Sequence, residues 1–146
     1  MKTARLLISI AWVVHLTAWF LPVAKEGLTL PQGLPGWQAF RVASCEVWPY
    51  ERFGIDGWYN VVLCTVSALT TLLFVLGSVW VVLFVSRPVR RVSAWIAASS
   101  FVLNAHWVVR FGSDRLDLRI GYFLWWFSFL LLSVGLFLLS HRADSP

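Results

Sequence analysis

The side chains best suited to catalysis or ligand binding are two histidines and a cysteine that lie within apolar segments. His15, Cys64 and His106 each fall in a different apolar run. An ionisable group inside a membrane is costly, so His15 is a functional-site hypothesis that could relay a proton, bind a ligand or hold a cofactor. The other interpretation, which we favour, is a neutral imidazole that bonds to Ser67 or Asn104 and holds helices together.

Neither pairing of these residues favours catalysis or a cofactor. His15 and His106 would differ in depth by ~6 Å at the rise of an α-helix, whereas haem ligands must face one iron from opposite sides. Cys64 and His106 could form a nucleophile and its base, but no acid is placed to orient the base and no cation to lower the pKa of the thiol. Phosphate-loop, HExxH and GxSxG motifs are absent from the sequence. We therefore expect no catalytic residue, no metal and no cofactor.

Depth along the apolar runs predicts two layers of polar side chains. His15, Ser67, Asn104 and Ser128 lie six to nine residues from the outer ends of their runs, within about one helical turn of one another in height. The predicted mid-membrane layer consists of His15, Ser67, Ser100, Asn104 and Ser128. The predicted layer nearer the outer face consists of Asn60, Cys64, His106 and Arg110.

Charge and hydropathy predict the helical segments that position these two layers. Only 13% of the 146 residues are charged, against about 25% in a soluble domain. The run from Trp58 to Val85 has no charged residue and as a helix exceeds the ~30 Å hydrocarbon thickness. The sequence predicts an all-α membrane protein, with one integral membrane domain over residues 1–146 and a four-helix antiparallel bundle. We expect its transmembrane helices at about 6–23, 58–85, 92–109 and 120–140.

Small and polar residues recur on each span at alternate spacings of three and four, the period of left-handed helix packing. In a membrane, such residues let helices approach and share hydrogen bonds. We expect these stripes to face inward: Ala4, Ile8, Ala11, His15, Ala18 and Pro22 in the first span, and Asn60, Cys64, Ser67, Thr71, Phe74 and Ser78 in the second. The corresponding stripes are Ser93, Ala97, Ser100, Asn104 and Trp107 in the third span, and Gly121, Trp125, Ser128, Leu132 and Gly135 in the fourth.

The connection 24–57 is predicted to be the one long extracytoplasmic loop. Its prolines and glycines exclude a single regular element. A short interfacial helix is predicted at about 36–48, with Trp37, Phe40 and Trp48 as interface residues and the two tryptophans at headgroup level; the alternative is a folded cap over the bundle. A Cys45–Cys64 disulfide would require the loop to dip into the bundle and is not expected. The tryptophans near span ends, including Trp107, Trp125 and Trp126, are interpreted as an aromatic belt.

Charge placement predicts the orientation. The basic residues flank apolar runs instead of forming a patch for phosphates, so the net charge of +5 indicates membrane topology and not nucleic-acid binding. Six basic residues crowd into three short segments that include both termini, which places both termini in the cytoplasm. Arginine outnumbers lysine ten to two, which favours a bacterial protein of the cytoplasmic (inner) membrane.

These features favour a small membrane protein that acts by binding, as an accessory, assembly or immunity-type subunit of a membrane complex. Its expected partners are the lipid bilayer and another membrane protein or further copies of itself, with no nucleic acid. The alternative is an oligomeric transporter or proton-linked carrier subunit that uses the polar layer around His15. An intramembrane enzyme or a b-type haem protein is less favoured.

Overall fold

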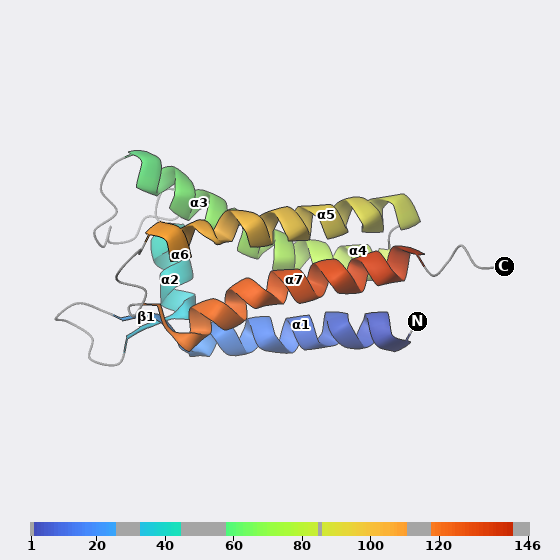
Figure 1. The fold of residues 1–146 in the computed structure, drawn as a ribbon, viewed down its shortest axis with the longest axis horizontal. Coiled ribbons are helices and arrows are strands. Elements are labelled where there is room, and N and C mark those ends of the chain that lie inside the picture. The colour runs from blue at the N-terminus through green and yellow to red at the C-terminus, as the bar shows by residue number, and fades with distance from the viewer. Residues whose placement is uncertain (1, 26–32, 45–57, 85, 111–117, 142–146) are drawn as a thin grey trace.

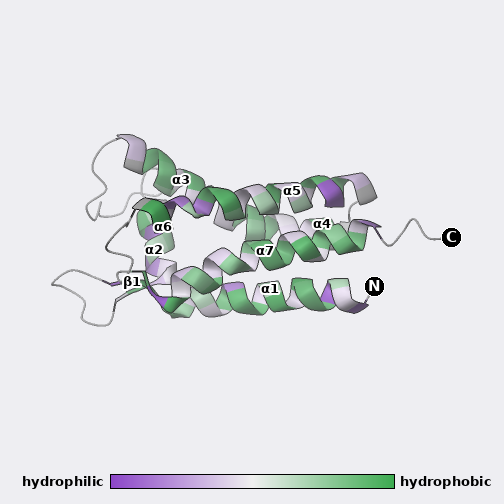
Figure 2. Cartoon of the chain, viewed as in Figure 1, coloured by the Kyte–Doolittle hydropathy of each residue, from purple (hydrophilic) through white to green (hydrophobic). Residues whose placement is uncertain are grey.

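The computed structural model describes residues 2–25, 33–44, 58–84, 86–110 and 118–141, without the side chains of residues 60, 82–84, 87 and 110. Within these ranges, four helical segments are long and apolar enough to cross a membrane: Lys2–Phe20, Val61–Val81, Pro88–Val109 and Ile120–His141. Hydrophobic residues extend along the length of each (Figure 2). The predicted all-α membrane protein with four long apolar helices is confirmed.

The first helix ends earlier than the sequence predicted. α1 spans Lys2–Phe20, not 6–23, and Pro22–Ala24 forms a short strand, β1. Pro22 causes this difference, because proline has no N–H for the helical ladder and disfavours helical geometry at the residue before it. β1 pairs antiparallel with β2, Leu34–Pro35, and Ala24 also bridges to Leu118.

A short helix lies across one end of the bundle (Figure 1). α2 spans Gly36–Ala43, within the predicted 36–48, and residues 45–48 lie outside the described residues. The Gly36 N–H donates to the Leu21 carbonyl at 3.1 Å, which ties the start of α2 to the end of α1. A side chain at Gly36 would collide with the Ala18 carbonyl, so only glycine allows this close approach. We call this end of the molecule the α2 end.

The second span is one helix with an irregular turn in its middle. α3 covers Trp58–Leu72, the π-helix η1 covers Leu73–Gly77 and α4 covers Ser78–Phe84. At the junction, the Ser78 hydroxyl donates to the Phe74 carbonyl and accepts from the Trp12 indole N–H. Such back-bonding by serine is a known cause of local bending in helices.

The third span is interrupted near the α2 end. α5 covers Arg87–Asn104 and α6 covers His106–Arg110, where a single helix at 92–109 was predicted. The break follows from the Tyr122 hydroxyl, which donates to the Asn104 carbonyl at 2.7 Å and competes with the helical ladder there. The earlier start reflects Pro88, which suits the first helical turn.

α7, Ile120–His141, is the centre of the bundle, because it packs along α1 on one side and along α5 on the other. The first residues of α1 and the last residues of α7 lie at the same end, opposite the α2 end (Figure 1). Gly135 of α7 faces Ile8 and Ala4 closely. The buried residues of α1 are the predicted stripe without Pro22: Ala4, Ile8, Ala11, His15 and Ala18.

Candidate functional site

His15 lies at the centre of the bundle with 0% of its surface exposed. The Ser128 hydroxyl donates to the Trp125 carbonyl at 2.6 Å, so its one hydrogen is already used. The 2.9 Å contact between His15 Nδ1 and Ser128 Oγ therefore assigns the ring proton to Nδ1, which donates to the hydroxyl. This tautomer leaves a lone pair on Nε2, a buried atom without a hydrogen-bond partner.

Aromatic rings enclose that imidazole. Phe74 stacks on it with ring centroids 3.9 Å apart and planes 9° apart, and Phe129 meets it edge-on at 5.8 Å. Phe74 and Phe129 also contact each other edge to face at 5.4 Å. The rings fill the space around His15, so the imidazole is held by packing as much as by its hydrogen bond.

A second polar cluster joins α3 to α5. The Ser67 hydroxyl donates to Asn104 Oδ1 at 2.8 Å, and Asn104 Nδ2 donates to Thr70 Oγ1 at 3.0 Å and to the Ser100 carbonyl at 2.8 Å. The Trp107 indole donates to Ser67 Oγ at 3.1 Å. Asn104 has 0% of its surface exposed, and both polar atoms of its amide are used in this cluster.

The predicted mid-membrane layer thus divides into two groups. His15 bonds to Ser128, and Ser67 bonds to Asn104, but no hydrogen bond among the described residues joins the first pair directly to the second. Ser100 reaches the second group through its carbonyl, while its own hydroxyl donates to the Ile96 carbonyl within α5.

Aromatic donors of α7 bridge from the first group to the second. The Trp125 indole donates to Thr71 Oγ1 at 3.1 Å, the Trp126 indole to the Phe101 carbonyl at 2.7 Å and the Tyr122 hydroxyl to the Asn104 carbonyl. Sequence analysis missed these roles, because it assigned the tryptophans to an aromatic belt. The available signal was that a buried indole N–H or phenol O–H needs a partner.

Of the predicted outer layer, the structure describes the side chains of Cys64 and His106. Cys64 is buried on α3, and His106 Nδ1 contacts the Leu103 carbonyl at 2.6 Å. The side chains of Asn60 and Arg110 lie outside what the structure describes, and so does the whole of Cys45.

The predicted interfacial aromatic residues point in different directions. Trp37 of α2 is exposed, whereas Phe40 turns toward α1 and stacks on Trp19 with centroids 5.5 Å apart. Trp48 lies outside the described residues. Phe40 therefore serves the interior of the α2 end and not its surface.

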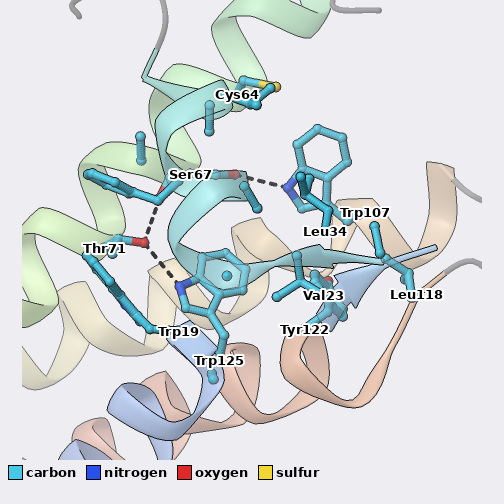
Figure 3. A pocket seen from close by; sticks show the side chains of 18 residues that line it. Trp19, Val23, Leu34, Cys64, Ser67, Thr71, Trp107, Leu118, Tyr122 and Trp125 are labelled. Carbon is cyan, nitrogen blue, oxygen red and sulfur yellow. Dashed lines mark hydrogen bonds between the residues drawn. The ribbon is translucent and has the colours of Figure 1, made fainter. Parts of the chain in front are cut away.

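A cavity of about 270 Å³ lies beneath α2, and Figure 3 shows its walls. α1, α2, α3, α6 and α7 all contribute to it, together with β1, β2 and Leu118. Its polar wall atoms bond to one another, since the Trp107 indole donates to Ser67 and the Trp125 indole donates to Thr71 (Figure 3). The rest of the wall is mainly apolar, made of aromatic faces and methyl groups together with the Cys64 thiol.

No family model, curated protein or solved structure matches the chain.

The chemistry open to this arrangement follows from its hydrogen bonds. Among the described side chains of the core, the amide and indole donors and the Ser67 hydroxyl join helices to one another, while hydroxyls such as those of Ser100 and Ser128 donate to carbonyls of their own helix. Within the described ranges there is also no group of three or more histidine, cysteine, aspartate or glutamate side chains that could hold a metal ion. Two features that could receive a ligand are the bare Nε2 of His15 and the apolar cavity beneath α2.

Proposed function

We propose that the chain is a binding component of a membrane complex, an accessory, assembly or immunity-type subunit that binds another membrane protein. The use of the core polar groups supports this proposal. Ser67, Asn104 and Ser128 are engaged in holding helices together, and an indole and a phenol hydrogen bond support the Ser67–Asn104 cluster. Such a core is suited to a stable framework that presents surfaces, and less suited to chemistry inside it.

The observation that carries the proposal is the position of α3. α7 packs extensively on α1 and α5, whereas α3 contacts mainly α2 and α5 among the other helices, and its end at Trp58 diverges from α6 (Figure 1). Its outward face keeps leucines exposed: Leu69, Leu72 and Leu73 on α3 and η1, then Leu76. An apolar helix with an exposed leucine face gains van der Waals contacts when a second transmembrane helix lies beside it.

A photocrosslinking experiment tests this site of contact. A benzophenone amino acid is placed at Leu69 on α3 or, as the matched control, at Leu16 on α1; the two positions are 50% and 49% exposed. After irradiation of intact membranes, the Leu69 probe should give one discrete protein adduct that survives mild detergent extraction, and the Leu16 probe should give none. Adducts of lipid alone, or equal protein adducts from both faces, would refute the proposal. The mass of the adduct distinguishes a second copy from another protein.

We further propose that the α2 end faces away from the cytoplasm, in a bacterial cytoplasmic membrane, with both termini inside and 24–57 as the long outer loop. The basic residues Lys2, Arg5, Arg90 and Arg91, at the ends of α1 and α5 remote from α2, support this orientation by the positive-inside rule. A green fluorescent protein fused after Pro146 should fluoresce in the cytoplasm. An alkaline phosphatase fusion at the same point should be inactive, and the reverse pair of results would invert the topology.

A proton-linked carrier subunit is the second candidate, favoured by one observation. His15 Nε2 is buried without a partner, which leaves a basic site in the middle of the membrane. Four spans are few for a complete pathway, so this role requires an oligomer. In proteoliposomes with a pH-sensitive dye inside, the parent should carry protons and His15→Leu should not, although it stays folded. Equal proton movement in both would remove this candidate.

A further inference from the structure

The cavity beneath α2 is large enough to hold part of a lipid. Its volume of about 270 Å³ is nearly twice that of an apolar cavity of ~150 Å³ that takes up benzene. By that proportion it has room for about ten carbon atoms, which is part of a single acyl chain.

The wall of the cavity selects an apolar occupant. Ser67 uses its hydroxyl hydrogen on Asn104, and Thr71 is placed to donate to the Ser67 carbonyl at 3.3 Å. The indole hydrogens of Trp107 and Trp125 are used by those same hydroxyls. A water molecule needs two to four polar partners to be held in a cavity, and the hydroxyl and indole hydrogens of this wall are already used.

α1 and α3 both line the cavity, and a gap separates their backbones. α2 packs against both α1 and α3, but α1 and α3 make no extensive contact with each other. Below the cavity the gap closes, because Phe74 of η1 stacks on His15 and the Trp12 indole bonds to Ser78. The cavity is partly open, and its wall includes Trp19 of α1 and Cys64 of α3, on the two helices that flank the gap (Figure 3).

We propose that this cavity binds one unbranched hydrocarbon chain, which enters sideways between α1 and α3 from the leaflet around the α2 end. An acyl chain matches the wall because it offers only C–H groups to aromatic faces and methyl groups. The inference is independent of the proposed partner contact. Ala68 faces the cavity and its neighbour Leu69 faces away from it, so either surface can be occupied without the other.

Photoreactive lipids in vesicles test the proposal at single-residue resolution. The protein is reconstituted in phosphatidylcholine vesicles that contain either a phosphatidylcholine or a free fatty acid with a diazirine in mid-chain. Labelled positions are read by mass spectrometry. Ala68→Phe fills the cavity from α3, and Leu69→Phe is the control that adds the same ring to the lipid-facing side of that helix. Ala39→Leu fills the cavity from α2 and serves as a second test if Ala68→Phe does not fold.

The parent and Leu69→Phe should both carry label on cavity residues such as Ala39 and Ala68, and Ala68→Phe or Ala39→Leu should lose that label. Label on the cavity from one probe and not the other identifies the source of the chain as phospholipid or free fatty acid. Label confined to lipid-facing residues such as Leu69 would overturn the proposal. Cavity label that persists in both filled variants would overturn it as well.

Discussion

Replacing Asn104 with leucine should loosen α3 from the rest of the bundle. Asn104 accepts from Ser67 and donates to Thr70, so its amide makes two hydrogen bonds from α5 to α3. α3 has limited contact with α5 beyond this point. Leucine has the same number and branching of side-chain heavy atoms as asparagine, so the substitution removes the hydrogen bonds while keeping a branched side chain of greater volume.

The expected loss of stability follows from the number of hydrogen bonds that the Asn104 amide makes to another helix. Hydrogen bonds between transmembrane helices contribute about 0.6 kcal/mol on average and at most about 1.7 kcal/mol. Two of them give about 1.2 kcal/mol, with an upper limit of about 3.4 kcal/mol. The third bond, from Nδ2 to the Ser100 carbonyl, lies within α5 and adds little, because that carbonyl is already in the helical ladder.

Reversible unfolding in mixed micelles with increasing dodecyl sulfate measures this cost. Asn104→Leu should lower the free energy of unfolding by about 1–3 kcal/mol. Ser99→Leu, at an exposed position of α5, is the control and should leave it unchanged within error. A double-mutant cycle with Ser67→Ala should give a coupling of about 0.6 kcal/mol. A coupling of zero, or an Asn104→Leu protein as stable as the parent, would show that the cluster does not hold α3.

Three further predictions concern the packing of the helices and the state of the buried imidazole. Gly36→Ala should destabilise the protein by about 1–3 kcal/mol, because its methyl group would collide with the Ala18 carbonyl. The control Gly77→Ala meets no neighbour and should be neutral or stabilising by up to about 1 kcal/mol. Thermal unfolding in detergent compares the two variants. Nitrogen-15 NMR of labelled protein should find the His15 proton on Nδ1, and a proton on Nε2 would contradict the assigned bond to Ser128. Trp126→Phe keeps an aromatic ring but loses the indole donor, and should cost about 0.6 kcal/mol in the same unfolding assay.

The spans were predictable because hydrocarbon excludes charge, and their borders coincide with charged residues. The breaks within them were harder to predict. Pro22 was a visible signal for the end of α1 at Phe20, since proline cannot continue the ladder. For η1 the local signal was weaker, the neighbouring Gly77 and Ser78, and the interruption at Ala105 had none. Both depend on side chains of other helices, Trp12 and Tyr122, whose partners are set only when the bundle forms.

Spacing predicted which face of α1 is buried, because small residues must lie where helices approach. Spacing could not predict which polar side chains contact each other within a layer. Depth places His15, Ser67, Asn104 and Ser128 at similar heights, yet height is one coordinate and the order of helices around the bundle is another. The structure supplies that order and gives the pairs His15–Ser128 and Ser67–Asn104.

The same pairing accounts for both the loose helix and the cavity. One pair belongs to α1 and α7, where Gly135 and small residues of α1 allow close packing. The other belongs to α3 and α5. Near the α2 end, what joins the two halves is a set of aromatic donors, with Trp125 reaching from α7 to Thr71. A bulky indole that bridges two helices also keeps them apart, so space remains beside it where α1 and α3 do not meet. Near the α2 end, aromatic side chains rather than small residues therefore connect the helices. This one feature explains both the divergence of α3 and the cavity.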